Sequence, residues 1–84
     1  MGKISEVRIV NDLLYHLRNE VLDSSVKLEA DTNLSSVGID SYSVIELVLF
    51  LERNYGIQIQ EKDMLPDNFK SVSALARCAA SYQD

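Results

Sequence analysis

Residues 41–55, SYSVIELVLFLERNY, carry apolar side chains on two sides of a predicted helix. One side has the three- and four-residue spacing of a core-facing stripe, formed by Val44, Leu47, Val48, Leu51 and Tyr55. The other side is a second apolar row of Tyr42, Ile45 and Leu49. A chain of 84 residues has no layer thick enough to bury both sides of this helix. We therefore expect a helical fold in which the second row stays exposed for docking.

Residues 4–22 are predicted to form a first helix, with Ser5 as its N-cap. Its main apolar stripe, which Ile9 and Leu13 widen, consists of Val7, Val10, Leu14, Leu17 and Val21. A long loop from Asp23 to Asp40 follows, and loops of such length in small domains tend to be functional. We expect this loop to be ordered because apolar anchors are scattered through it: Val26, Leu28, Leu34, Val37 and Ile39.

The last third of the chain predicts one short helix and one regular helix. Gly56 stands where the C-terminal cap of the helix 41–55 is expected. A short helical turn is predicted near Glu61 to Leu65, broken at Pro66. Ser71 caps a last helix whose apolar face is Val72, Leu75, Ala76 and Ala79. Residues 1–84 are therefore expected to be a single all-α domain, a four-helix bundle with a long first loop and a short third helix.

The composition excludes several classes of protein. A net charge of −5 and a pI near 4.7 argue against a nucleic acid partner and favour a partner with a basic patch. The single cysteine, Cys78, excludes an internal disulfide and is expected to be a small packed residue. No segment has the length of a membrane span or the pattern of a signal peptide, so we expect a cytoplasmic monomer that does not bind membranes.

The residues of a catalytic site or a metal site are not found together in the sequence. The only histidine, His16, is far in sequence from Ser41 and is expected to be a helix surface or groove residue. Glu61, Asp63 and Asp67 lack the spacing of a calcium loop and are expected to form a solvated face. We therefore expect neither an enzyme nor a metal centre.

The strongest candidate site is the turn before the apolar helix. Asp40 is placed to act as N-cap, with its carboxylate accepting from the backbone amide of Tyr42 or Ser43 and favoured by the helix dipole. Ser41 would then be the first helical residue, with its hydroxyl directed outward. Taken alone, an Asp-Ser-x-Ser motif more often only starts a helix.

The longer stretch from Leu28 to Ile59 resembles the acyl carrier protein family. The matching elements are Asp31, Leu34, Gly38-Ile39-Asp40-Ser41, Ile45-Glu46-Leu47, Tyr55 and Ile57-Gln58-Ile59. The order of the helices and the long first loop also match, so the resemblance covers nearly the whole chain. It implies that Ser41 accepts 4′-phosphopantetheine from coenzyme A in a reaction run by a separate phosphopantetheinyl transferase. It further implies that Asp40 helps the transferase to position metal and coenzyme A.

The resemblance also implies a function and a set of partners. The arm would hold acyl intermediates as thioesters, loaded by an acyl-loading ligase or acyltransferase. A ketosynthase or other acyl-processing enzymes of fatty acid, polyketide or mixed biosynthesis would receive them. Tyr42, Ile45 and Leu49 would make apolar contact with these enzymes, and Glu46 and Glu52 would supply the charge that basic partners recognise.

Three departures from the family pattern indicate a specialised pathway with dedicated partners. Tyr42 stands where the family usually has leucine, Arg53 where acidic members place another acid, and Gln60 where proline is frequent. Asp40 before the serine favours an acyl carrier over a typical peptidyl carrier, yet aminoacyl loading stays open. The alternatives are an aminoacyl or peptidyl carrier of a nonribosomal pathway and an unmodified helical protein-interaction domain.

Overall fold

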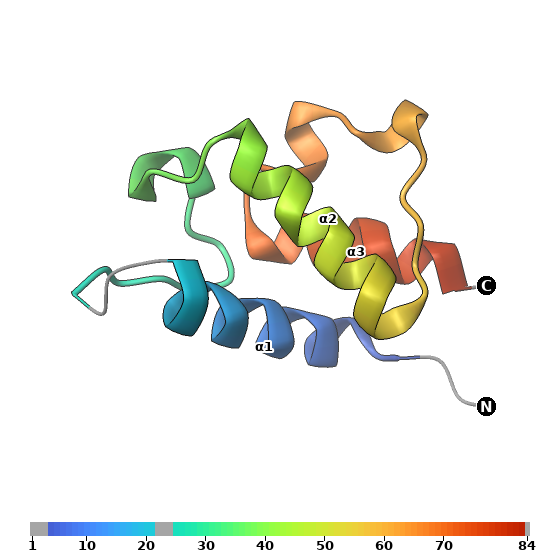
Figure 1. The fold of residues 1–84 in the computed structure, drawn as a ribbon, viewed down its shortest axis with the longest axis horizontal. Coiled ribbons are helices and arrows are strands. Elements are labelled where there is room, and N and C mark those ends of the chain that lie inside the picture. Colours follow the sequence, from blue (N-terminus) through green and yellow to red (C-terminus); the bar gives the residue numbers. More distant parts are fainter. Residues whose placement is uncertain (1–3, 22–24, 84) are drawn as a thin grey trace.

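The computed structural model describes residues 4–21 and 25–83, which form three α-helices joined by loops and short 3₁₀ turns (Figure 1). α1 spans Glu6–His16, α2 spans Ser41–Tyr55 and α3 spans Val72–Ala80. α1 and α3 pack together, and α2 runs obliquely across them in Figure 1. Neither described range contains a strand, so the expected all-α class is confirmed. No helix in these ranges is long and apolar enough to cross a membrane.

Helix α1 begins as predicted, at a serine cap. The Ser5 hydroxyl accepts a hydrogen bond from the backbone amide of Arg8 at 3.1 Å, which satisfies one of the free amides of the first turn. A π-helical turn, Leu17–Val21, continues the helix beyond His16. Leu22, the last residue of the predicted helix, lies outside the described residues.

The predicted phase of the α1 stripe was wrong. Ile9, Leu13 and Leu17 are completely buried and form the centre of the helix interface, whereas Val7 is 69% exposed. Val10 and Leu14 are only partly buried at the edge of the core. Both candidate stripes have helical spacing and share Leu17, so periodicity alone could not select the buried one.

The long first loop is held in place by buried anchors and by backbone hydrogen bonds. Leu28, Leu34 and Ile39 are at most 5% exposed, which confirms them as anchors. The amide of Leu34 donates to the Lys70 carbonyl at 2.9 Å, and a second such bond joins Ser73 to Ala30 at 2.9 Å. The loop is therefore attached both to the segment before α3 and to the first turn of α3, although Asp23 and Ser24 lie outside the described residues.

Two 3₁₀ turns, Glu61–Asp63 and Pro66–Asn68, replace the short third helix of the expected four. The prediction for Pro66 needs correction, since this proline begins the second turn and does not end the first. Its fixed φ and missing N–H suit the first position of a helical turn. The prediction that Asp63 belongs to a solvated face was also wrong. Asp63 is half-buried and accepts a hydrogen bond from the Tyr82 hydroxyl.

The buried core is entirely aliphatic. Every buried hydrophobic residue in the described ranges is Ile, Leu, Val or Ala. The predicted core stripe of α2 is confirmed, since Val44, Leu47, Val48 and Leu51 are at most 9% exposed and Tyr55 packs at the edge of the core. Cys78 also packs against the core, as expected, and burial raises the pKa of its thiol. All aromatic rings therefore remain at the edge of the core or outside it.

Candidate functional site at the head of helix α2

The head of α2 is shaped by a glycine turn followed by an aspartate cap. Gly38 has φ +87°, a left-handed conformation that favours glycine, and it ends the 3₁₀ turn Leu34–Val37. Asp40 then adopts an extended backbone, and its Oδ1 accepts from the Ser43 amide at 3.0 Å. This confirms Asp40 as the N-cap. The prediction named the amide of Tyr42 or that of Ser43 as the donor, and the donor is the Ser43 amide. The chain therefore enters α2 with its first residue, Ser41, directly after the cap.

The cap changes the acidity of Asp40. The hydrogen bond from the Ser43 amide holds the pKa of this exposed carboxyl below its ordinary value of 3.8, because it favours the ionised form. The positive end of the α2 dipole acts in the same direction. At neutral pH the head of α2 therefore carries a full negative charge at Asp40.

Asp40→Asn is expected to reduce the loss of stability on acidification. The folded pKa of Asp40 lies below the unfolded value of 3.8, so its stabilising contribution is present above that value and is lost as pH falls through the folded pKa. Asparagine keeps an accepting oxygen but does not titrate. Urea unfolding at about pH 7, 4 and 2.5 should show a smaller acid loss for the variant than for the wild type. Equal losses would contradict a charge-dependent cap.

Ser41 occupies the first position of a 15-residue helix. Its flanking residues Asp40 and Tyr42 are exposed, so this part of the backbone lies at the molecular surface. The structure does not describe the Ser41 side chain, so the outward direction of its hydroxyl stays a prediction. Free amides and the positive dipole end make the start of a helix favourable for an attached phosphate.

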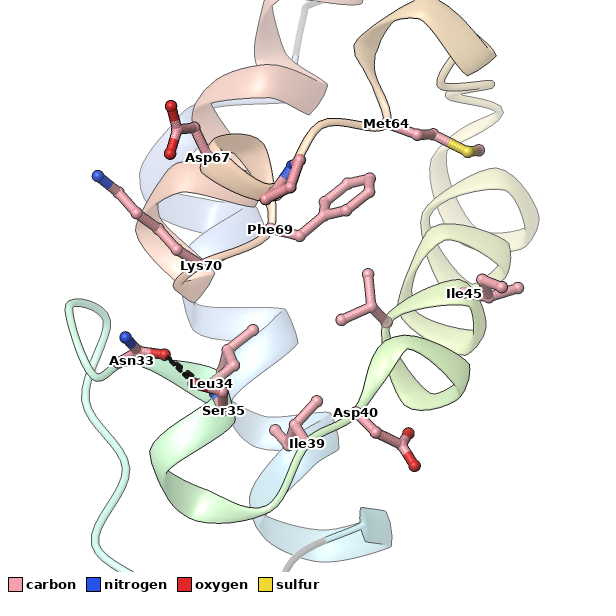
Figure 2. Close-up of a pocket in the computed structure, with 12 residues that line it drawn as sticks. Asn33, Leu34, Ser35, Ile39, Asp40, Ile45, Met64, Asp67, Phe69 and Lys70 are labelled. Carbon is pink, nitrogen blue, oxygen red and sulfur yellow. Dashed lines mark hydrogen bonds between the residues drawn. The ribbon is translucent and has the colours of Figure 1, made fainter.

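A groove of about 720 Å³ opens beside the head of α2 (Figure 2). One wall comes from the loop and the first turns of α2, including Ile39, Val44 and Ile45. The other wall comes from the segment after α2, where the Phe69 ring points into the space between the walls (Figure 2). The charged ends of Asp40, Asp67 and Lys70 point away from this space. The interior of the groove is therefore mainly apolar, and its charges lie at the outer edges.

The second apolar row of α2 is exposed, as the sequence predicted. Tyr42 is 70%, Ile45 55% and Leu49 47% exposed, and the carboxylates Glu46 and Glu52 are exposed on the same helix. Ile45 belongs both to this row and to the groove. The row and the groove therefore form one continuous apolar surface next to Ser41.

Sequence reasoning missed the second wall of the groove. Met64 and Leu65 are 41% and 53% exposed, and Met64 lines the groove with Phe69. The available signal was the presence of apolar residues in an otherwise polar stretch around Pro66. This signal does not show where the segment folds back, and only the tertiary structure places it opposite α2.

The sequence profile described as "Phosphopantetheine attachment site" matches residues 12–79. The protein therefore belongs to this family of phosphopantetheine-dependent carrier proteins, in which 4′-phosphopantetheine is covalently attached. The head of α2 fits such a group, because exposed backbone, a helix start and an apolar groove lie together there.

Similar proteins come from Bradyrhizobium. "Aminoacyl carrier protein 2" of Bradyrhizobium diazoefficiens is 23% identical over 73 residues, which cover 84% of this chain and 82% of the relative. A chain in the crystal structure of Bradyrhizobium japonicum glycine:[carrier protein] ligase complexed with glycylated carrier protein matches with a TM-score of 0.68 and 26% identity. That match covers 87% of this chain and 96% of the other.

A second crystal structure holds the same ligase with its cognate carrier protein and an analogue of glycyl adenylate. The match has a TM-score of 0.70 and 25% identity, and it covers 90% of this chain and 96% of the other. Both structures therefore place a chain of this fold in a complex with a loading enzyme.

Proposed function

We propose that this protein carries an amino acid as a thioester on a 4′-phosphopantetheine arm attached to Ser41, with residues 1–84 acting as one carrier domain. The observation that carries the cargo assignment is the similarity to an aminoacyl carrier protein and to carrier chains crystallised with a glycine ligase. These relatives favour the aminoacyl alternative over the fatty acid or polyketide cargo expected from the sequence.

The hydroxyls of Ser35 and Ser36, the two serines that most closely precede Ser41 in the sequence, are already used in hydrogen bonds. This supports Ser41 as the attachment residue. The hydroxyl of Ser35 donates to the Asn33 side chain at 2.8 Å, and that of Ser36 donates to the Asn33 carbonyl at 2.6 Å. Both hydroxyls help to close the 3₁₀ turn. Ser41, by contrast, follows the Asp40 cap at the start of α2, where the family resemblance places the modified serine.

The chemistry of attachment and loading is assigned to other proteins. His16, the only histidine of the chain, does not line the groove beside Ser41 and instead packs against the Phe50 ring, with centroids 4.7 Å apart. A separate transferase would therefore activate the serine, with Asp40 presented to it as an exposed carboxylate. A separate ligase would load the cargo.

The attached group supplies a thiol at the end of a flexible arm, which holds the cargo as a thioester. The residues of this chain position that arm. Ile39, Val44, Ile45 and Phe69 would contact its apolar atoms within the groove. The arm also raises the effective concentration of the cargo at each docked enzyme.

The cargo is tested by loading the modified protein. Coenzyme A and a promiscuous phosphopantetheinyl transferase should first add one phosphopantetheinyl group, detected by intact mass. The product is then offered glycine and a panel of amino acids with ATP and aminoacyl ligases, including the Bradyrhizobium japonicum glycine ligase. In parallel, fatty acids are offered with ATP and an acyl ligase. Aminoacyl adducts released by hydroxylamine are expected, and loading by fatty acids alone would overturn the aminoacyl assignment.

Ile45→Glu is expected to impair loading without unfolding the protein. The side chain is 55% exposed within the apolar row, so a carboxylate there costs little in the free protein but is desolvated against a partner. The KM for the loading ligase should rise on the order of tenfold. Val44→Glu is the matched control, because Val44 is buried on the adjacent face and its replacement should unfold the protein. Unfolding of the Ile45 variant would show that Ile45 belongs to the core.

A further inference from the structure

A second hollow, of about 430 Å³, lies between α1 and the C-terminal half of α2. Its lining is Arg8, Asp12, Tyr15, His16, Glu20, Phe50, Asn54 and Tyr55. It shares no residue with the groove beside Ser41. At about 1.5 Å per helical residue, Phe50 lies about 14 Å along α2 from Ser41. The hollow is therefore separate from the proposed attachment site.

Aromatic rings are concentrated in this hollow. The whole sequence contains four Tyr, two Phe and one His, and four of these seven rings line it. The Phe50 ring is 4.7 Å from that of His16 and 6.2 Å from that of Tyr55, the second pair edge to face, and Tyr15 is 71% exposed. None of these rings is fully buried, although Phe50 and Tyr55 pack with one side against the aliphatic core. Aromatic side chains grouped at a surface are typical of protein interfaces.

The charges around these rings favour a cation. Asp12 accepts a hydrogen bond from the Tyr55 hydroxyl and lies 3.6 Å from Arg8, so its charge is already partly matched. Glu20 is exposed and makes no ion pair within residues 4–21 and 25–83. Aromatic faces beside an unmatched carboxylate attract a guanidinium group, which stacks on rings and binds carboxylates with its planar fork.

We propose that this hollow is an interaction site that takes an arginine side chain of a partner protein. The guanidinium stacks on Tyr15, the exposed ring of the hollow, and its charge is balanced by Glu20. Because the site lies on the far part of α2, a protein bound there leaves Ser41 accessible. One partner can then hold the carrier while another acts on the arm, which increases the effective concentration of the second enzyme's substrate.

The site is tested on the unmodified protein with N-acetyl-arginine methylamide as the probe. Titration followed by ¹H–¹⁵N and ring proton NMR should give saturable shifts at Tyr15, His16, Glu20 and Phe50. The uncharged analogue N-acetyl-citrulline methylamide has the same length. Its affinity should be lower by at least about threefold. Equal binding of the two probes, or shifts spread over all surface carboxylates, would overturn the proposal. The readout needs no arm or cargo, so its result is independent of the proposed function.

Matched variants separate the site from general charge attraction. Glu20→Gln and Tyr15→Ala should each weaken the arginine probe by about threefold. Glu29→Gln and Tyr42→Ala are the controls, since both residues are exposed but lie outside the hollow, and they should leave the affinity unchanged. All four substituted side chains are exposed, so the fold should persist. If Glu29→Gln and Glu20→Gln lowered the affinity for the arginine probe equally, the net charge of the protein would explain the attraction. That result would contradict the proposed site.

Discussion

Ser41→Ala is expected to abolish the mass gain on incubation with coenzyme A and a phosphopantetheinyl transferase. The alanine removes the only atom proposed to form the bond to the arm. Alanine is also well tolerated at the first position of a helix, and the cap from Asp40 to the Ser43 amide does not involve the Ser41 side chain. The free energy of unfolding should therefore change by about 0.5 kcal/mol or less. Intact mass spectrometry measures the first result and urea unfolding the second.

Ser43→Ala is the control for this experiment. Ser43 lies two residues further along α2 and contributes its backbone amide to the Asp40 cap, which alanine also provides. This variant should be modified as fully as the wild type. Modification of the Ser41 variant, with or without that of the control, would place the attachment elsewhere in the chain.

Leu51→Ala is expected to cost about 2–5 kcal/mol of stability, the usual range for a buried leucine whose removal leaves a cavity. Leu51 is completely buried on the core face of α2. An 84-residue chain has a small core and total stabilities of about 5–15 kcal/mol are usual, so this loss is a large fraction of the whole. Urea unfolding followed by circular dichroism measures the shift in midpoint.

Leu49→Ala, on the same helix, is the matched control. Leu49 is 47% exposed in the apolar row, so its truncation should cost no more than about 1 kcal/mol. It should instead weaken loading by the ligase. Similar stability losses for the two leucine variants would contradict the assignment of one face of α2 to the core and the other to docking.

The bounds of α2 and the start of α3 could be predicted because local signals mark them. Asp40 accepts from an amide of the first turn of α2, and Gly56 ends that helix with φ +69°. Ser71 likewise caps α3, accepting from the Ala74 amide at 3.1 Å. Such caps depend only on residues adjacent in sequence, so the sequence is sufficient to locate them.

The failed predictions concern features that depend on tertiary contacts between residues distant in sequence. The buried face of α1 depends on where α3 and the loop lie, and two stripes sharing Leu17 were compatible with its sequence. Asp63 was assigned to solvent because its partner, Tyr82, is distant in sequence and meets it only after the chain folds back. The wall formed by Met64 and Phe69 was missed for the same reason.

At the candidate site, the sequence predicted the Asp40 cap and the exposed row but favoured an acyl cargo. Tyr42, Arg53 and Gln60 distinguish this chain from the usual family pattern, but these departures do not identify a cargo. Under the proposed function, a separate ligase selects the cargo, and this chain presents the surface that the ligase recognises. Similarity to carriers with known loading enzymes is therefore more informative about cargo than the carrier's own composition.

The side chain of Gln83, after α3, is bonded to the backbone of Ile4, before α1: it accepts from the Ile4 amide at 2.9 Å and donates to the Ile4 carbonyl at 2.7 Å. The start of α1 and the end of α3 lie at one end of the long axis, and the first turn of α2 lies toward the other (Figure 1). A linker from Gln83 to Ile4 would therefore be short. A fluorophore attached near the end of α3 would lie away from the first turn of α2, where the proposed attachment residue Ser41 stands, and this arrangement suits single-molecule measurements of partner exchange.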